Sequence, residues 1–451
     1  MRRISILLLL FAGGLATAAP EPLTLEQTVN LALRRSRAMQ LARLKVDEAG
    51  AGVDAAVAQR YPQTTVVGLA GYTPRPYEIK LPSGSLTPLI TAFGAQLGIP
   101  SSSSLLSTFP PGDMTLSRGN HEIYLAGVGI IQPLSLQWKI DTGVIAARAG
   151  RTAAQREEAE EASQIRFFVE QLYCGILVED RRHSARAARL EARKARLRDV
   201  QNAQGVGEVL DDSVLGLQAE VTEVQADLLR SGQERGRLTL QLGDLIGAPG
   251  TEQIALNSDL PDRLEHPLEY WLARVPHNPS RQVAAAQAEQ AAAGVRAARQ
   301  DYIPDVSLVA LGYAQDGEEL FPRDSALVGV TLKWDVFDFG RKRAEVRRSL
   351  ARQGSAEANR ERLEENAARE IRIAYQDLEY AEELSKLAGQ ACVYRQRAAE
   401  IARQSAEHDL SLPAKAQAAG ADLQQAEADL FAAEIQRRLA LLKLYWLCGE
   451  L

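Results

Sequence analysis

The sequence predicts a mixed α and β protein that consists mostly of long α-helices and is built as two similar halves. Only 6% of its 451 residues are aromatic, while Ala, Glu, Gln, Arg and Leu dominate, a composition typical of long helices and coiled coils. The segment "AGVGIIQPLSLQWKIDTGVIAARAGR" has a counterpart in "ALVGVTLKWDVFDFGRKRAEVRRSLA" in the second half. Apolar residues also recur at alternating spacings of three and four along extended segments, which indicates coiled-coil packing.

Composition excludes several function classes. The net charge of -6 leaves no basic surplus for nucleic acid. The three cysteines and five histidines are scattered, without the spacing of a disulfide framework or a metal site. The sequence has no phosphate-binding loop, serine-nucleophile elbow or cysteine dyad. We therefore expect no enzyme activity, no cofactor and no metal.

The first 18 residues have the pattern of an export signal. Arg2 and Arg3 precede the apolar run "ISILLLLFAGGL", and small residues follow in "ATAA". A membrane anchor is the alternative, but the run is shorter than the about 20 residues that a spanning helix needs. We expect cleavage after Ala18 and a mature chain without a membrane helix.

The mature chain divides into a first repeat at 19–250 and a second at 251–451. Each opens with an Ala-rich helix, continues through "RYP" or "YIP", and enters a short strand that ends in "GY". The two copies lie about 240 residues apart, too far for the repeating unit of a solenoid. The pattern indicates a duplicated half.

A long helical hairpin is predicted in each repeat, at 139–246 and at 340–447. The hairpins break briefly at "GVGEV" and "HDLSLP", and they end near "LGDLIGAPG" and "LKLYWLCG", where glycine is a usual helix stop. A helix of about 65 residues would be about 100 Å long, which no compact core requires. The predicted coiled-coil seams are Val214, Leu217, Val221, Val224 and Leu228 in the first hairpin and Ile371, Ala374, Leu378 and Ala381 in the second.

Four strands are predicted, at 63–72, 122–134, 305–314 and 326–337. In the first, Thr65, Val67 and Leu69 alternate with small residues, and aromatic residues lie near strand ends. This alternation suits an outer-membrane strand, but a strand of a soluble sandwich has the same pattern, so the strands alone leave both interpretations open.

The number of strands favours an oligomeric pore. Four strands cannot close a barrel, eight give an interior filled by side chains, and twelve from three chains would enclose a water-filled lumen. Trp334, Phe337 and Phe339 are then candidates for an interfacial aromatic girdle. The cations that follow, Arg341, Lys342, Arg343, Arg347 and Arg348, would lie near lipid headgroups, although the last two equally suit a solvated helix face.

The chain resembles the outer membrane efflux proteins of the TolC-like family over nearly all of its mature length. The residues that carry the resemblance are "LTLEQTVNLAL", "RYP", "YIP", "WDVFDFGRKRAEV" and "QAEADLFAAEIQRRLALLKLYWLCG". The resemblance implies a TolC-like homotrimer with a twelve-stranded outer-membrane β-barrel, four strands per chain, which continues into a coiled-coil α-helical tunnel.

The same resemblance implies a function. The trimer would sit in the outer membrane of a Gram-negative bacterium and extend into the periplasm. There it would bind a periplasmic adaptor protein and an inner-membrane transporter, as the passive exit duct of a tripartite efflux pump or type I secretion system. A secreted periplasmic coiled-coil scaffold is the alternative, and the sequence does not name the cargo.

Two further features are tied to this topology. The loop at 73–120 holds seven prolines and the run "SSSS", a composition that opposes regular structure, and we expect it outside the cell. At the hairpin tips, Glu208, Asp211, Asp212 and Asp409 are candidates for acidic rings at the periplasmic entrance. Helix capping is the competing explanation for Asp211 and Asp212.

Overall fold

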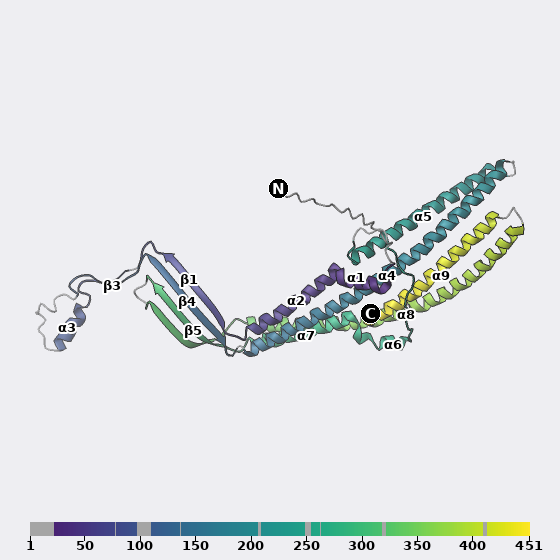
Figure 1. Cartoon of the computed structure of the whole chain (residues 1–451). Coiled ribbons are helices and arrows are strands. Elements are labelled where there is room, and N and C mark those ends of the chain that lie inside the picture. The colour runs from purple at the N-terminus through teal and green to yellow at the C-terminus, as the bar shows by residue number, and fades with distance from the viewer. Residues whose placement is uncertain are drawn as a thin grey trace, which may run out of the picture. The chain divides into compact units, whose positions relative to one another are not determined.

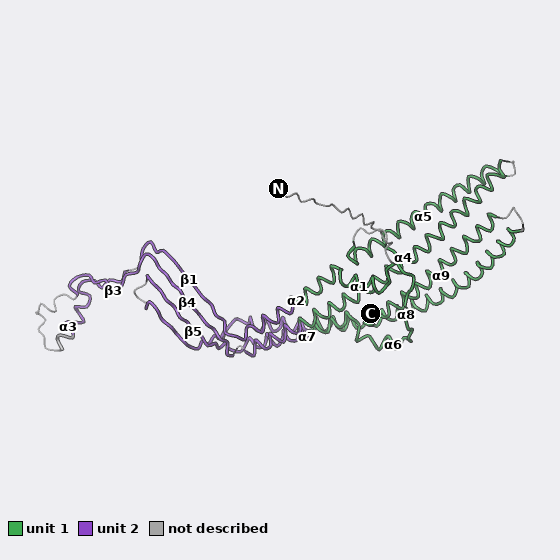
Figure 2. The backbone as a smooth tube through the Cα atoms, viewed as in Figure 1, with its two compact units in different colours: residues 1–48, 150–288, 354–451 green, residues 49–149, 289–353 purple. Residues whose placement is uncertain are grey.

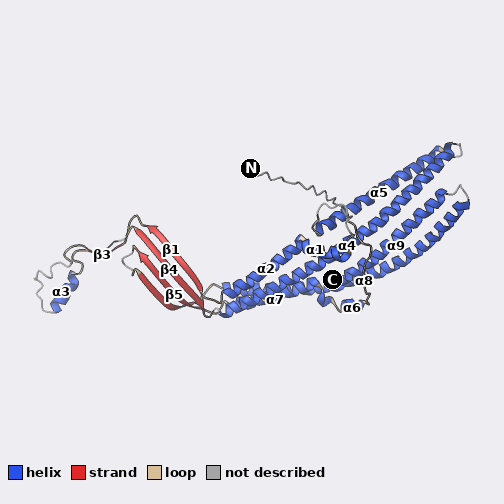
Figure 3. Ribbon diagram, in the orientation of Figure 1, coloured by secondary structure: helices blue, strands red, loops and turns tan. Residues whose placement is uncertain are grey.

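The computed structural model shows a mostly helical chain with a small antiparallel sheet (Figures 1 and 3). It describes residues 22–76, 78–96, 110–135, 137–205, 209–248, 254–261, 263–317, 322–408 and 413–451. The expected signal segment, Glu208 and Asp409 lie outside these residues. The chain forms two compact units, one of residues 1–48, 150–288 and 354–451 and the other of residues 49–149 and 289–353 (Figure 2).

The two halves of the sequence form corresponding elements in the same order. The first half has α1 (Leu25–Arg35), α2 (Arg37–Ala58), β1 (Gln63–Tyr72), β4 (Glu122–Pro133), α4 (Gln137–Gly205) and α5 (Asp211–Leu245). The second half has α6 (Leu268–Leu272), the 3-10 helix η1 (Val275–His277), α7 (Pro279–Gln300), β5 (Asp305–Asp316), β6 (Asp324–Lys333), α8 (Arg341–His408) and α9 (Pro413–Leu447). The long helices therefore lie where the heptad pattern predicts them.

Each half builds its own hydrophobic core in the unit of residues 1–48, 150–288 and 354–451, which we call the helical unit. In the first half, Ala32 of α1 packs with Val169 and Ile176 of α4 and Leu242 of α5. In the second half, Trp271 of α6 packs with helices α8 and α9, through residues that include Ile371, Leu378 and Leu444. The short helices at the start of each half thus cover the base of its own hairpin.

The ends of these helices are set by local hydrogen bonds. Thr24 and Gln27 form a capping box at the start of α1, with the Thr24 N–H donating to Gln27 Oε1 at 3.0 Å and the Gln27 N–H donating to Thr24 Oγ1 at 3.3 Å. Gly247 and Gly449, which follow α5 and α9, have φ angles of 71° and 70°. Glycine adopts this left-handed conformation without the steric penalty of a Cβ. The glycine stops expected from the sequence are confirmed.

The four long helices form a row in the order α5, α4, α9, α8. Helix α5 packs on α4 through Val221, Val224 and Leu190. Helix α4 meets α9 where Cys174 and Val178 contact Ile435. Helix α9 joins α8 in the second core and, farther along, through an ion pair between Arg395 Nη1 and Asp422 Oδ2 at 3.0 Å.

A buried carboxylate joins the two halves. The Glu170 side chain in α4 is only 5% exposed and accepts from Arg438 of α9 at 2.8 Å and from Arg263, in the segment before α6, at 2.7 Å. Arg438 also donates to the Pro261 carbonyl oxygen. One carboxylate therefore bridges two guanidinium groups from the second half.

The sheet of the second unit has the order β1-β4-β5-β6, with every neighbouring pair antiparallel. The outer strands β1 and β6 each leave one edge without a strand partner in the described chain. The first three strands match the residues predicted for them to within two positions, and β6 ends earlier than predicted.

The segment that begins at residue 73 corrects one prediction. Although its prolines oppose regular structure, it contains strand β2 (Glu78–Leu81), helix α3 (Thr87–Gln96) and strand β3 (Met114–Arg118). Strands β2 and β3 pair antiparallel. The prolines do not prevent this because Pro82 follows β2, Pro88 lies in the first turn of α3, and Pro110 precedes β3, where no helix or ladder N–H is needed.

The ion cluster around Glu170 yields a stability prediction. In Glu170→Gln, two buried guanidinium groups lose their counter-charge, and removing one partner of a buried pair costs about 3–5 kcal/mol. We expect a clearly lower unfolding temperature by circular dichroism. The control is Asp227→Asn, which breaks an exposed pair with Arg230 worth about 0–1 kcal/mol. Equal shifts in the two variants would show that the buried cluster does not hold the halves together.

Candidate functional site

The sheet exposes both of its faces. Because the strands pair in register, even-numbered residues share one face and odd-numbered residues the other. Val66, for example, pairs with Val128, which pairs with Gly312. Every residue of β1 is exposed. We call the two surfaces the even face and the odd face of the sheet.

The even face carries a band of exposed apolar side chains with aromatic residues at both ends. The band includes Val66, Val128, Ile130, Val328, Val330 and Leu332. At one end lie Tyr72 and Tyr124, and at the other end Trp334 follows β6. An apolar band between aromatic residues is the pattern of a lipid-facing surface.

The odd face is hollowed. A cavity of about 730 Å³ lies over it, lined by residues that include Val67, Leu69, Leu125, Leu311 and Tyr313. Gly127 and Gly129 of β4 leave room there because they have no side chains. The sheet is therefore concave on its odd face, which is the side that would face inward in a closed barrel.

The predicted end of the fourth strand, at residue 337, needs a correction. Strand β6 ends at Lys333, so Trp334, Phe337 and Phe339 lie in the connection to α8 and not in the strand. Asp338 shapes this connection, because its carboxylate accepts from the backbone N–H groups of Gly340 at 3.0 Å and Lys342 at 2.9 Å. The bond from Lys342 is the main cause of a lowered pKa for Asp338. Because Asp338 holds the start of α8, the chain turns before the strand can continue.

The three aromatic rings remain exposed in this connection. Trp334 is 55% exposed and Phe339 is 92% exposed. Phe337 and Phe339 pack edge to face with ring centroids 4.7 Å apart. No other part of the described chain buries them, so their place in an aromatic girdle stays a prediction.

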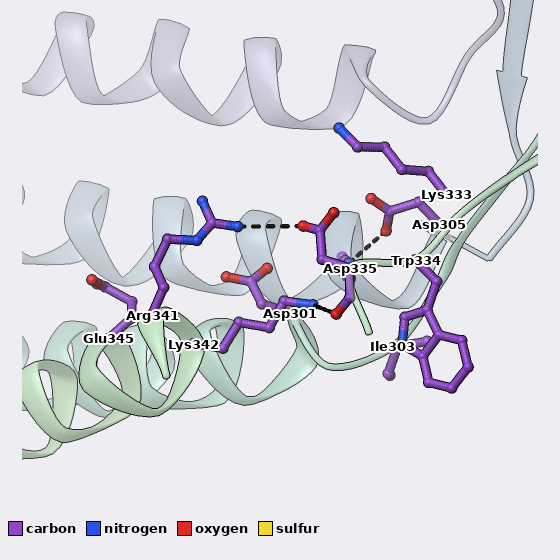
Figure 4. Close-up of a pocket in the computed structure, with 10 residues that line it drawn as sticks. Asp301, Ile303, Asp305, Lys333, Trp334, Asp335, Arg341, Lys342 and Glu345 are labelled. Carbon is purple, nitrogen blue, oxygen red and sulfur yellow. Dashed lines mark hydrogen bonds and ion pairs between the residues drawn. The ribbon is translucent and has the colours of Figure 1, made fainter. Parts of the chain in front are cut away.

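A charged cluster that the sequence analysis missed lies at the same junction (Figure 4). Lys139 Nζ of α4 lies 2.5 Å from Asp305 Oδ1 of β5. Arg341 Nη2 lies 3.3 Å from Asp335 Oδ2, and Lys342 Nζ donates to the Asp335 carbonyl oxygen at 3.0 Å. The cluster surrounds a cavity of about 350 Å³ and fixes the starts of α4 and α8 to the ends of the strands.

The candidate acidic residues at the hairpin tips are only partly described. Asp211 and Asp212 are the first two residues of α5, whose N-cap is Leu210, and no side chain caps this end. Asp211 Oδ1 accepts from Gln204 Nε2 at 2.6 Å. Neither aspartate is therefore a capping residue in the strict sense, although both suit the positive end of the helix dipole.

The His, Cys, Asp and Glu side chains of the described residues do not gather into a metal site. No group of three or more His, Cys, Asp or Glu side chains among them is arranged to hold a metal ion. Burial raises the pKa of the Cys174 and Cys448 thiols to about 12, so both stay protonated at neutral pH. Within the same residues, no helix combines the length and the apolar character needed to span a membrane.

Comparison with known proteins supports the resemblance. A family model described as outer membrane efflux protein matches residues 275–450, which is less than half of the chain. The resemblance seen in the sequence is confirmed. No curated protein sequence matches the chain significantly.

The fold of the outer membrane efflux proteins extends over nearly the whole chain. The outer membrane protein VceC of Vibrio cholerae is 18% identical with a TM-score of 0.70, and the match covers 94% of this chain and 96% of that one. The CmeC outer membrane channel of Campylobacter jejuni is 14% identical with a TM-score of 0.73 and coverages of 94% and 85%. The MtrE outer membrane channel of Neisseria gonorrhoeae is 17% identical with a TM-score of 0.69 and coverages of 94% and 88%. The predicted TolC-like fold is confirmed for the single chain.

Proposed function

We propose that this protein forms a trimeric channel in the outer membrane of a Gram-negative bacterium. The channel would extend into the periplasm as the exit duct of a tripartite efflux pump or a type I secretion system. One observation carries the proposal: a four-stranded sheet with two open edges has an apolar, aromatic-flanked even face and a concave odd face.

The open edges require other copies of the chain. Strands β1 and β6 are ten residues each, so each edge presents about five outward N–H groups and as many carbonyls, because backbone groups alternate in direction along a strand. Each group left unbonded in hydrocarbon costs several kcal/mol. Pairing β6 of one copy with β1 of the next removes this cost, and the ring must close to remove it everywhere.

Three copies satisfy the requirement of a pore. Two copies would give eight strands, whose interior is filled by side chains, whereas twelve strands leave a water-filled lumen. The family and fold described above support this assembly. The even face would then contact outer-membrane lipid, with Trp334 at the membrane boundary nearer α8.

The fold supports a passive duct that depends on partners. The long hairpins have a length suited to the periplasm, and the efflux protein domain supports docking to a periplasmic adaptor protein and an inner-membrane transporter. As a passive duct, the channel would conduct what the transporter delivers to it. A soluble scaffold is less well supported, because in the described residues no second sheet covers either face of β1-β4-β5-β6.

The assembly is tested by mass. We expect the protein, purified from membranes in mild detergent, to give a native mass of three chains, because neither edge strand is satisfied in a smaller open form. Fractionation of cells should place it with the outer membrane. A stable folded monomer, or recovery in the soluble periplasmic fraction, would refute the barrel.

The topology is tested by labelling the loop between β1 and β4. Ser85 is exposed and lies between β2 and α3. A Ser85→Cys variant in intact cells should react with a membrane-impermeant maleimide, because β1 begins at the periplasmic helices and must end outside. A matched Ser213→Cys variant at the start of α5 should react only after the outer membrane is disrupted. The reverse pattern would invert the topology.

The acidic tip is tested by ion selectivity. We propose that Asp211 and Asp212 line the periplasmic entrance, where threefold symmetry would turn each into a ring that attracts cations. The Asp211→Asn, Asp212→Asn double variant should lose cation preference in planar-bilayer recordings. If the aspartates act only on the helix dipole, the variant should lose stability and keep its selectivity. The Asp227→Asn protein, which removes one carboxylate away from the tip, serves as a control.

A further inference from the structure

Both faces of the sheet β1-β4-β5-β6 are apolar, although a wall between lipid and water needs only one apolar face. The even face has its aromatic-flanked band. The odd face also has apolar side chains over its middle, and these include Val67, Leu69 and Leu311, which are 56%, 57% and 45% exposed. Because the inward surface of an outer-membrane barrel is usually polar, the apolar odd face needs an explanation of its own.

The two ends of the odd face are polar. At the end nearer the helices, Asp305 lies opposite Lys333 in the register of β5 and β6, and Lys139 Nζ lies 2.5 Å from Asp305 Oδ1. At the other end, Gln315 of β5 and Ser325 of β6 share this face. Charged groups at one end and amide and hydroxyl groups at the other suit a surface that water reaches, which is the lumen in the proposed channel.

The apolar middle of the odd face is hollowed. Gly127 and Gly129 of β4 form the floor of the cavity of about 730 Å³, and side chains of the neighbouring strands form its walls. A Cβ added at Gly129 would lie 3.2 Å from Leu311 Cδ2, so the Leu311 side chain leans over this glycine. A Cβ added at Gly127 would have the Gly312 carbonyl oxygen as its nearest neighbour, at 3.4 Å. The hollow therefore depends on glycine at two positions where any other side chain would enter it.

The lining of the hollow has the chemistry of a ligand pocket. Apart from Thr65, Tyr313 and Gln315, the described residues that line it are apolar or glycine, and none of them is charged. Thr65 pairs with Gly129 and Gln315 with Leu125, so these two polar side chains lie toward opposite ends of the hollow. Small-molecule pockets measure about 300–1,000 Å³ and combine a mostly apolar lining with a few polar groups. An exposed apolar surface of this kind marks a place where apolar molecules bind.

We propose that the hollow on the odd face is a binding site for small, uncharged organic molecules with a mostly apolar surface. The inference rests on the proposed channel, because only there does the odd face line a lumen. It goes beyond the channel because a passive duct requires no binding site, whereas here the barrel wall itself holds cargo of one chemical class. Charged molecules bind less well because the lining offers no counter-charge. Threefold symmetry would place three such sites in one channel.

Protection of a cysteine tests the binding. Leu69→Cys places a thiol in the wall of the hollow, in the full-length Cys392→Ser protein reconstituted in lipid nanodiscs. Cys174 and Cys448 are buried and should not react. A charged, water-soluble methanethiosulfonate should modify the new thiol, and 2-naphthylmethanol, an uncharged apolar probe, should slow this modification several-fold. The anion 2-naphthalenesulfonate, which has the same rings, should slow it much less.

A second cysteine on the same face serves as the matched control. Thr331 of β6 is exposed on the odd face and does not line the hollow. In Thr331→Cys, 2-naphthylmethanol should leave the rate of modification unchanged. A general effect of the probe on the bilayer or on the reagent would change both rates alike.

Filling the hollow gives an independent measurement. Gly127→Leu, added to the Leu69→Cys protein, should abolish the protection because the new side chain occupies the floor. Gly329→Leu is the matched variant, since Gly329 lies on the odd face of β6, outside the hollow, and a Cβ added there meets nothing within 4 Å. It should leave the protection intact. Both variants should keep the native mass of the parent, which separates loss of binding from loss of folding.

The outcomes separate this inference from the proposed function. Equal slowing at the two cysteines, equal effects of the two probes, or protection that survives Gly127→Leu overturns the binding site and leaves the channel intact. A Leu69→Cys thiol that does not react even without a probe shows that another part of the protein covers the hollow, which also overturns the site. A parent protein that is monomeric or soluble overturns the proposed channel itself.

Discussion

For the proposed channel, the need to bond every backbone group in hydrocarbon is the constraint on which the rest of the structure depends. In the sheet β1-β4-β5-β6, the inner strands β4 and β5 have a hydrogen-bonded partner on both sides, whereas β1 and β6 each have one open edge. No rearrangement within one chain of four strands closes those edges at a width that also leaves a lumen. If the sheet lies in a membrane as proposed, oligomerisation is therefore part of the fold.

The duplication explains how one chain meets this requirement with few distinct parts. Each half contributes two strands, one long hairpin and its own core, centred on Val169 and Leu242 in one half and on Trp271 and Ile371 in the other. The halves also meet through apolar contacts of Cys174 and Val178 in α4 with Ile435 in α9. The Glu170 carboxylate joins the two halves as well, because it binds both Arg263 and Arg438. Loss of the Glu170 carboxylate or of either arginine would leave a charge buried without its counter-charge, so this cluster helps to fix the geometry of the row of helices.

Much of this architecture could be predicted from the sequence, because long helices and glycine stops are local signals. The seam at Val214, Leu217 and Val221 was visible as a heptad and is buried. The strand end at Lys333 was not predictable from alternation, since Trp334 and Val336 continue the pattern while Asp338 starts the helix by bonding two backbone N–H groups. The average proline content of residues 73–120 does not predict the short elements there. The position of each proline decides which backbone N–H is lost, and therefore which helix or strand it prevents.

One physical reason explains why sequence reasoning does not find the ion pairs of Glu170 and Lys139. Glu170 meets Arg438 across 268 positions, and Lys139 meets Asp305 across 166, so no periodic pattern marks either pair.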